Sequence, residues 1–465
     1  MTQTIDIERF RAKLSGAALT RGDVGYDEAR AAWNGAIDRY PAVIVRCADA
    51  RDVTMAIGLA RERGLDISVR GGFHNAAGRA ICDDGLMIDL SPMRDVSVDP
   101  VARRARVGGG ATVGDLDTAT QEFGLATPAG MVSHTGVGGL TLGGGMGWLT
   151  PQYGLMLDNL VCAEVILADG HRLRAAADEN PDLFWALRGG GGNFGVVTNF
   201  EFRLHPVGPI VHLGLFFWGL AQGSEALRLS RDVVATLPAG ATAAIVGLNA
   251  PPAPFVPEQF HRMPGYALLI AGFGTQGEHA RIVANIREAL PALFDFVTPM
   301  PYTQLQQIID EDSRWGLHCY DRAVFLDELS DDVIEVITEH QPRKTSPLSV
   351  LFIDALGEAY GKVGDDETAF GGSRAAQFNA FLIAKAEDAE QLPGARAWVR
   401  SFSEALRPHA NGGGSYLNVM AVDEDRVRDA YGPAKYARLA RIKAEYDPDN
   451  VFHHNANIKP ALQPI

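Results

Sequence analysis

The sequence predicts an α+β protein of two or three domains, and three observations support this. The chain has 465 residues, more than one domain of the usual size holds. Up to about residue 206, short apolar strands and helices follow one another with glycine between them. Beyond residue 206 the apolar segments lengthen and amphipathic helices separate them, which favours an antiparallel sheet covered by helices on one face.

The composition is that of a folded, water-soluble protein. Hydrophobic residues make up 46% of the chain and charged residues 21%, without low-complexity tracts. No apolar run is long enough to cross a bilayer, and the charged N-terminal segment lacks the features of a secretory signal, so we expect a cytoplasmic protein. The net charge of -15 and the lack of a basic stripe argue against nucleic acid and anionic membranes as partners.

The cysteines and histidines give no sign of a metal site. The four cysteines are far apart and form no CxxC pair, so we expect free, buried thiols at Cys47, Cys82, Cys162 and Cys319. No histidine or carboxylate lies at ligand spacing from His74. The adjacent His453 and His454 cannot face the same way on a regular element, and we expect structural roles for both.

In the first half, capping residues and apolar spacing predict the elements in order. A helix is expected from Asp52, its N-cap candidate, to Gly64, which ends it. A second helix is expected between Thr112 as the cap and Gly124 as the end. Apolar alternation predicts strands at 65–72, 85–91 and 103–110.

In the second half, longer segments with the character of strands lie at 210–220, 266–274, 349–357 and 375–386. Helices are predicted between them, among others at 224–237 and 280–294. A glycine-rich break near Gly412 precedes a tail whose helix ends before Asp447. We expect this tail to return to the first domain.

Glycine clusters point to a ligand of the first half. They lie at 71–72, 108–110, 135–148 and 187–202. A single cluster is best explained as a tight turn, but several between strands favour a large phosphate-bearing ligand cradled by backbone N–H groups. The segment GGGNFG at 190–195 has dinucleotide-fingerprint spacing, yet a helix precedes it and a strand follows, which is the reverse of a Rossmann site.

Four segments, in order along the chain, resemble one family of flavoproteins. They are RGGFHNAAG (70–78), SHTGVGGLTLGGGMGWLTPQYGLMLDN (133–159), DLFWALRGGGGNFGVVT (182–198) and YDPDNVFHHNANI (446–458). The chain thereby resembles flavoproteins of the vanillyl-alcohol oxidase type, in particular the branch of berberine bridge enzyme and 6-hydroxy-D-nicotine oxidase. The resemblance implies a two-subdomain, PCMH-type FAD-binding domain at 1–206, a substrate domain at 207–411 and a berberine-bridge-like tail at 412–465.

The resemblance also implies how FAD is held. In this family the histidine of the first loop bonds covalently to the 8α carbon of FAD, so His74 is the expected attachment point. Relatives with a second covalent bond have a cysteine at the position of Val132, so we expect one bond, and Cys162 is not expected to substitute. The other residues expected to bind FAD are Arg70, Gly71, Gly72, Phe73 (where the family has glycine), Asn75, Gly78, Ser133, Thr135, Gly136, Gly138, Gly139, Gly143, Gly147, Gly192, Asn193, Val196, Val197, Tyr416, Asn418 and Asn455.

The reaction implied is oxidation of an alcohol or amine carbon of a small organic substrate by hydride transfer to FAD, with O2 as the reoxidant and peroxide as its product. An alcohol must also give its O–H proton to a base, whereas a neutral amine need not. The base tyrosines of plant-type relatives are replaced here by Met146 and Val419. The expected catalytic residues are Tyr320, Glu358, Tyr416 and Asn418, with Asp354 as a further polar candidate.

Simpler roles and other functions stay open at this point. Asp354 and Glu358 are equally well explained as a solvated strand end, and Tyr320 as a buried tyrosine bonded to backbone. The alternatives to an oxidase are a dehydrogenase of the same fold or an oxidative cyclase of secondary metabolism using another acceptor. More remote are a flavin-binding protein without turnover and a nucleotide-binding protein without flavin. An oligomer is compatible with the sequence.

Overall fold

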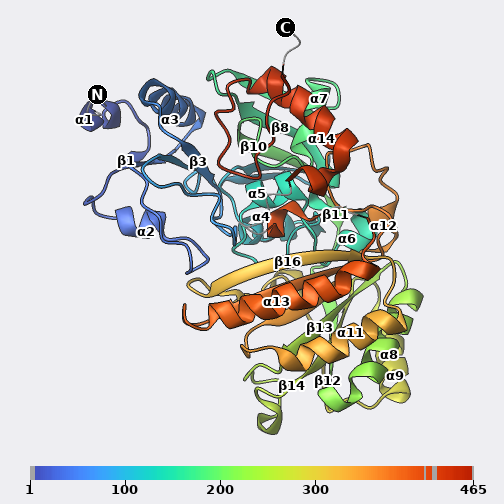
Figure 1. Ribbon diagram of the computed structural model, residues 1–465. Helices are drawn as coiled ribbons and strands as arrows, with labels where there is room; N and C mark the ends of the chain where they lie inside the picture. The colour runs from blue at the N-terminus through green and yellow to red at the C-terminus, as the bar shows by residue number, and fades with distance from the viewer. Residues whose placement is uncertain (1–5, 413–414, 421–426, 463–465) are drawn as a thin grey trace.

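The computed structural model describes residues 6–412, 415–420 and 427–462 and contains two halves, one above the other in Figure 1. The upper half combines the N-terminal segments with the C-terminal segment. The lower half is a large sheet with its helices. The α+β class predicted from the sequence is confirmed.

The first sheet of the upper half has the strand order β1-β2-β4-β3. Strand β1 is antiparallel to β2, whereas β4 is parallel to both β2 and β3. The strands are Ala17–Leu19 (β1), Val43–Arg46 (β2), Ile67–Arg70 (β3) and Leu86–Asp89 (β4), and the helices are Ile7–Arg11 (α1), Tyr26–Arg30 (α2) and Ala50–Arg63 (α3). Strand β3 ends where the first glycine-rich loop begins, so this sheet fixes the start of that loop.

Helix α3 begins three residues earlier than predicted. Its N-cap is Asp49, whose side chain accepts hydrogen bonds from the Arg51 and Asp52 N–H groups. Asp52 instead lies inside the first turn and is fully buried, where its carboxylate accepts N–H bonds from Ser15, Gly16 and Ala48. The predicted end is found, because Gly64 takes a left-handed φ of 63° after the last helical residue.

The second sheet is antiparallel, with the order β5-β6-β10-β8-β9. Its strands are Val96–Asp99 (β5), Arg104–Gly108 (β6), Leu160–Ile166 (β8), Arg172–Ala176 (β9) and Val196–Arg203 (β10). The remaining elements of this part are a two-stranded sheet of Leu125–Ala126 (β7) and His205–Pro206 (β11) and the helices Val113–Gln121 (α4), Val137–Gly143 (α5), Thr150–Tyr153 (α6) and Pro181–Leu187 (α7). Thr112 caps α4 in a capping box with Asp115, as the sequence predicts for the cap.

The lower half is a seven-stranded antiparallel sheet in the order β15-β12-β14-β13-β17-β18-β16. Its strands are Ile210–Gly219 (β12), Ala241–Asn249 (β13), Pro264–Gly272 (β14), Phe294–Pro301 (β15), His318–Leu326 (β16), Val350–Ala355 (β17) and Phe378–Ala386 (β18). One face is covered by Gly223–Thr236 (α8), Gln276–Ala289 (α9), Asp331–His340 (α11) and Leu392–Leu406 (α13), as Figure 1 shows. The short helices Tyr302–Leu305 (α10) and Gly357–Gly361 (α12) complete this half.

The other face of this sheet turns toward the upper half. Phe217 and Leu269 of the sheet belong to one buried cluster with Trp148 and Leu149 of the upper half. The two halves therefore share a hydrophobic contact on the face opposite α8, α9, α11 and α13, where the short helix α10 also packs, and the candidate site lies on this side.

The predicted helix at 280–294 ends earlier, at Ala289. Pro291 follows, and a proline has no N–H to continue the helical hydrogen bonds. The next strand, β15, begins at Phe294. The segment predicted as one helix thus contains the start of an edge strand.

The C-terminal segment packs against the upper half through helix Val427–Tyr446 (α14). Leu439 and Ile442 share a core with Leu183 and Phe194 of the first half. The three domain segments expected from the sequence, 1–206, 207–411 and 412–465, stay a prediction about the domain borders.

All four cysteines are buried and free, as predicted. No helix of the described residues is both long enough and apolar enough to cross a membrane.

Candidate active site

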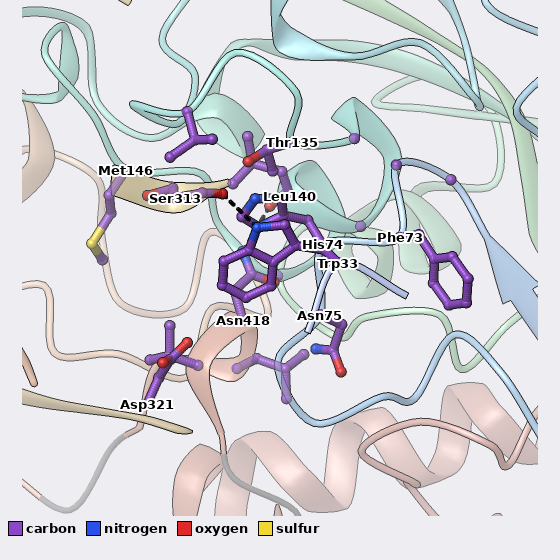
Figure 2. A pocket seen from close by; sticks show the side chains of 18 of the residues that line it. Trp33, Phe73, His74, Asn75, Thr135, Leu140, Met146, Ser313, Asp321 and Asn418 are labelled. Carbon is purple, nitrogen blue, oxygen red and sulfur yellow. Dashed lines mark hydrogen bonds between the residues drawn. The ribbon is translucent and has the colours of Figure 1, made fainter. Parts of the chain in front are cut away.

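A cavity of about 500 Å³ lies between the glycine-rich loops of the upper half and the bare face of the seven-stranded sheet. Figure 2 looks into it, with Phe73, His74 and Asn75 on one loop, Thr135 and Leu140 on a second segment, and Asp321 on the sheet. Segments far apart in sequence meet here, since the C-terminal segment contributes Asn418. The cavity is therefore lined by residues of both halves.

The first loop follows β3 and contains a residue in an unusual backbone conformation. Phe73 has a φ of 61°, a left-handed value that costs a residue other than glycine roughly 1–2 kcal/mol. Its ring is buried beside Ile44 and Met87, and the guanidinium of Arg70 lies 4.7 Å from the ring centroid. Packing thus holds Phe73 in the conformation that a glycine would take freely.

The imidazole of His74 stacks on the indole of Trp33, with 4.0 Å between ring centroids and 20° between ring planes. The Nε2 atom of His74 is buried and has no hydrogen-bond partner among the described residues. Burial lowers the pKa of His74 to about 3, and the neighbouring His134 contributes in the same direction. At neutral pH His74 is an uncharged imidazole, which is the nucleophilic form.

The second glycine-rich loop touches the first one backbone to backbone. A Cβ at Gly72 would lie 2.1 Å from the Gly136 nitrogen, and one at Gly136 equally close to the Gly72 nitrogen, so only glycine fits at either position. At Gly139, in contrast, no described atom lies within 4 Å of a Cβ position. Because Gly139 also lines the cavity, a side chain there would occupy ligand space.

The third loop, 189–195, is fixed by the C-terminal segment. The Asn193 side chain donates hydrogen bonds to the carbonyl oxygens of Gly190 (2.9 Å) and Ala456 (3.1 Å) and accepts one from the Ile458 N–H (2.9 Å). Asn455 Nδ2 donates to the Gly192 carbonyl at 3.0 Å, whereas its Oδ1 is buried without a partner in the described part of the chain. His454 also lines the cavity, and its Nε2 atom lies 2.7 Å from the Ile81 carbonyl oxygen; the structural role expected from the sequence stays a prediction.

The opposite wall is the seven-stranded sheet, to which β12, β13 and β14 contribute apolar residues and β16, β17 and β18 the part described next, whose middle is apolar. Phe352 lies next to Phe381 in the register of β17 and β18, and Val350 lies next to Ile383. Both pairs line the cavity. This wall suits a flat or aliphatic part of a small ligand.

Charged groups stand at the ends of this apolar floor. In the strand register, Ile383 of β18 lies between Asp321 of β16 and Val350 of β17, so the three residues form one row across the sheet. Asp354 lies four residues beyond Val350 along β17, about 13 Å away at the usual rise of a strand. Burial raises the pKa of each carboxyl to about 7. Lys385, whose pKa burial lowers, lies near Asp321 and donates to the Asp312 carbonyl at 2.7 Å.

Tyr416 and Asn418 join the tail to the second loop. The Tyr416 hydroxyl accepts hydrogen bonds from the Gly145 N–H and from Asn418 Nδ2, both at 3.0 Å. Asn418 Nδ2 also donates to the Leu140 carbonyl at 3.0 Å. Burial raises the pKa of Tyr416, so its hydroxyl keeps its proton.

The structure brings most of the predicted site residues to the cavity wall. Those that line it are Gly71, Gly72, Phe73, His74, Asn75, Thr135, Gly136, Gly138, Gly139, Gly143, Gly192, Asn193, Val196, Val197, Tyr416, Asn418 and Asn455. Val132 lines it as well, whereas Cys162 lies in β8 with its thiol on Glu201. The predicted residues that lie outside the wall are Arg70, Gly78, Ser133, Gly147, Tyr320 and Glu358.

Two of the predicted catalytic residues, Tyr320 and Glu358, lie away from the cavity. Neighbouring side chains of a strand point to opposite faces, and Tyr320 of β16 points to the helix side, where its hydroxyl accepts hydrogen bonds from Arg322 and Arg400. Its neighbour Asp321 faces the cavity instead. Glu358 is 80% exposed and pairs with Lys362 on α12, which agrees with the solvated role.

Several site residues escaped the sequence analysis. Trp33 lies in a loop far upstream, and no spacing links it to His74. His134 lies inside a recognised segment, but its contact with His74 depends on how two loops cross. Asp321 and Lys385 are set apart from neighbouring candidates by the face of the strand on which they lie. The sequence did not reveal that face, because β16 and β18 carry apolar residues on both faces.

The donor set and shape fit a large phosphate-bearing cofactor. Three glycine-rich loops form one wall, Gly139 leaves space that a Cβ would fill, and the buried His74 Nε2 and Asn455 Oδ1 lack partners in the described ranges. Backbone N–H groups of such loops suit phosphate, and buried polar atoms without partners at a cavity wall can take one from a ligand.

Comparison with known proteins agrees with this reading. Residues 41–176 match the family described as FAD binding domain, and residues 415–459 match the one described as berberine and berberine like. The chain is 31% identical over 459 residues to an FAD-linked oxidoreductase of Dictyostelium discoideum, covering 98% of this chain and 97% of the relative. It is 31% identical over 470 residues to (R)-6-hydroxynicotine oxidase of Paenarthrobacter nicotinovorans, covering 96% and 97%.

A solved structure of a relative has a similar fold. The crystal structure of 6-hydroxy-D-nicotine oxidase from Arthrobacter nicotinovorans superposes with a TM-score of 0.85 at 29% identity, covering 96% of this chain and 98% of that one. The likeness therefore includes both halves and the tail.

Proposed function

The chain belongs to the berberine-bridge-enzyme-like family of FAD-linked oxidoreductases, and from this we propose that it is an oxidase acting on an alcohol or amine carbon of a small, largely apolar substrate. The observation that carries the proposal is the cavity itself. Its FAD-side wall of glycine-rich loops faces a sheet whose aromatic floor has a carboxyl group at each end. The apolar residues of the sheet would hold the body of the substrate, and a carboxyl group at the end would contact its reacting group.

The residues that would hold FAD are those of the three glycine-rich loops and the tail, with His74 as the single covalent attachment point. FAD, when bound, supplies a two-electron acceptor for the substrate C–H bond, and O2 restores it with release of hydrogen peroxide. A neutral His74 supports the covalent bond, because the attacking nitrogen needs its lone pair. Val132 stands where relatives with a second bond carry cysteine, which supports a single bond.

On the substrate side, Asp354 is the best-placed proton acceptor. It is 7% exposed, lines the cavity, and has a pKa raised to about 7 by burial, close to the working range of a general base. The hydroxyl of the neighbouring Tyr416 accepts hydrogen bonds from the Gly145 N–H and from Asn418 Nδ2, so its own O–H would be able to orient a substrate oxygen or nitrogen. An alcohol would give its O–H proton to Asp354, whereas an amine bound in neutral form would need only orientation.

Acid precipitation of the purified protein tests the cofactor part of this proposal. We expect yellow colour in the pellet and a flavin adduct on the peptide that contains His74 and on no other. Colour that stays in the supernatant would contradict the covalent bond.

Anaerobic mixing with a panel of alcohols and amines tests the reaction. We expect at least one compound to bleach the flavin absorbance, and admission of air to restore it with formation of peroxide. Bleaching that air reverses only slowly would identify a dehydrogenase with another acceptor instead.

A further inference from the structure

Asp321 and Lys385 form a polar site at the β16 edge of the sheet wall. Both side chains line the cavity, and Figure 2 shows Asp321 there. In the register of β16 and β18, Asp321 lies opposite Ile383 and Lys385 lies opposite Cys319, so Asp321 and Lys385 are diagonal neighbours, roughly 7–8 Å apart. They therefore present a carboxyl group and an amine to the same part of the cavity.

Neither side chain has all the partners that a buried polar group requires. Asp321 Oδ1 is buried and has no hydrogen-bond partner in the described part of the chain. Lys385 is 5% exposed, and of the three hydrogen bonds that an ammonium group can donate, it makes one within the described residues, to the Asp312 carbonyl at 2.7 Å. Buried polar groups without partners cost free energy, so a ligand that supplies those partners is favoured here.

Buried polar contacts fix the backbone of both strands at this site. The Asn34 side chain, 1% exposed, accepts a hydrogen bond from the Cys319 N–H at 2.9 Å and donates one to the Cys319 carbonyl at 3.0 Å. On β18, the Ser349 hydroxyl accepts from the Lys385 N–H at 3.2 Å, and the Ser346 hydroxyl donates to the Lys385 carbonyl at 2.5 Å. The two strands are thus held by residues from other segments, as a preorganised binding site requires.

The site is too far from Asp354 for one functional group of a ligand to contact both. Along the strands, four residues, or about 13 Å, separate the row of Asp321 from the row of Asp354, and β16 and β17 are two strand spacings, or about 10 Å, apart. A substrate whose reacting carbon lies at Asp354 would extend over the apolar Phe352 and Phe381 before it came to Asp321. A second polar group of the substrate would lie there.

The chemistry of the pair selects an uncharged group that both donates and accepts hydrogen bonds. One carboxyl group and one amine have opposite charges when ionised and none when neutral, so the pair has no net charge. The charges of Asp312 and Arg314 also act on Lys385, with opposite signs. A ligand ammonium group would meet a second cation at this site, and a ligand carboxylate would meet a second anion. A carboxamide has an N–H for the carboxyl oxygen and, beside it, a carbonyl oxygen for the ammonium group.

We propose that Asp321 and Lys385 form a specificity site for a carboxamide group, which the substrate carries at the end remote from its oxidised carbon. This inference deepens the proposed function and rests on it, since it places the oxidised carbon near Asp354. The substrate class is then an alcohol or amine with a distal amide, joined to the reacting carbon by an apolar body.

Binding of four related compounds to the holoenzyme tests the site. The compounds are hydrocinnamamide, its N,N-dimethyl derivative, hydrocinnamate and hydrocinnamamidinium, and isothermal titration calorimetry gives the dissociation constant of each. In the wild type we expect hydrocinnamamide to bind about tenfold or more tightly than each of the others, because the dimethyl derivative has no N–H to donate and the other two bring a charge. Equal affinities, or no binding of any of the four, would overturn the proposal.

Substitutions that change the charge of the pair should change which compound binds most tightly. Lys385→Met leaves only the carboxyl group, so the amidinium compound should bind best. Asp321→Asn leaves only the amine, so hydrocinnamate should bind best. The matched control Asp332→Asn, at an exposed position of α11, should keep the wild-type order. The wild-type order in Asp321→Asn would overturn the role of the pair, and this isosteric variant decides alone should Lys385→Met fail to fold.

The binding test is separate from the test of the proposed function. None of the four compounds has an alcohol or amine carbon, so their affinities do not depend on oxidation. A flavin that no alcohol or amine bleaches would defeat the proposed function and leave the measured preference for the carboxamide in place. Loss of that preference in an active oxidase would defeat the specificity site alone.

Discussion

The ammonium group of Lys443 lies 2.6 Å from the carbonyl oxygen of Asn193 and 2.6 Å from the carboxylate of Asp447. Both charged side chains are fully buried, and a third hydrogen bond reaches the Phe452 carbonyl. Helix α14 is thereby fastened to the glycine-rich loop that lines the cavity. The C-terminal segment is thus part of the cavity wall as well as of the core.

Removal of this ammonium should destabilise the protein strongly. Lys443→Met leaves the Asp447 carboxylate buried without its cation, and we expect a loss of about 3–5 kcal/mol in the free energy of unfolding, measured by urea denaturation. Lys362→Met, which breaks an exposed pair with Glu358, should change it by less than about 1 kcal/mol. The idea fails if the two variants unfold at the same urea concentration.

A methyl group at Gly72 should separate the first two loops. The Cβ of Gly72→Ala would lie 2.1 Å from the Gly136 nitrogen, so the loops must move apart and FAD binding should be lost, as seen by flavin content after purification. Gly58→Ala is the control, because no described atom lies within 4 Å of that Cβ in α3. There alanine should stabilise the helix by about 0.5–1 kcal/mol and leave the flavin content unchanged.

Asp354 should set the pH dependence of alcohol oxidation. Its folded-state pKa is raised to about 7, so the carboxylate that accepts a proton forms as the pH rises through 7, and kcat for an alcohol should rise with it. Asp354→Asn should lower kcat about 100-fold or more and flatten this profile. Asp332→Asn, at an exposed position of α11, should leave the profile unaltered.

Asp117 should make the protein less stable toward neutral pH. It is 2% exposed between α4 and α10, and burial raises its pKa to about 7, although a hydrogen bond from Gln306 opposes this. In the unfolded chain the carboxyl ionises near pH 4, so between pH 4 and 7 the folded state binds the extra proton and stability falls as the pH rises. Below pH 4 both states are neutral and no penalty exists.

Asp117→Asn should therefore raise the free energy of unfolding at pH 7 by about 2–4 kcal/mol and change it little at pH 4. The amide can also donate to the Gln306 Oε1 atom, which is buried without a partner among the described residues. Equal effects of the substitution at the two pH values, in parallel urea titrations, would show that Asp117 is ionised in the folded protein.

The strand register of β16 can be checked with adjacent substitutions. Tyr320→Phe removes a hydroxyl that lies among arginines on the helix side and should cost about 1 kcal/mol of stability while kcat/KM stays within twofold. Asp321→Asn changes a cavity carboxyl and should shift KM about tenfold. The opposite pattern in steady-state kinetics would mean that Tyr320 faces the substrate.

Local signals in the sequence were enough for elements that begin and end at distinctive residues. Gly64 ends α3 and Thr112 caps α4, because each conformation depends on one residue type. The cap of α3 was misassigned since Asp49 and Asp52 are equally good acceptors, and only the contact of Asp52 with residues 15 and 16 separates them. That contact joins segments 36 residues apart, which no local pattern contains.

The site residues, too, were predictable where the signal is local and not where it depends on contacts between distant segments. Those of the glycine-rich loops were predictable, since close backbone contacts such as Gly72 with Gly136 demand one residue type. The sheet wall was not, because β16 and β18 carry apolar residues on both faces and the register stays open without the tertiary contacts. Trp33 and His134 contact His74 only because loops from different parts of the chain meet in the fold, so the sequence alone does not reveal these contacts.

The division of the cavity between two walls has a consequence for how new specificity can arise. Three neighbouring strands of the sheet place the residues at 321, 350, 352, 354, 381 and 383 on the cavity, and these positions belong to strands rather than to the glycine-rich loops. Exchanges at these six positions can be combined as a library while the nucleotide-holding loops keep their sequence. Under the proposed function, the loops that would hold FAD must stay constant, whereas the residues of the strands that face them can be exchanged by natural or laboratory selection.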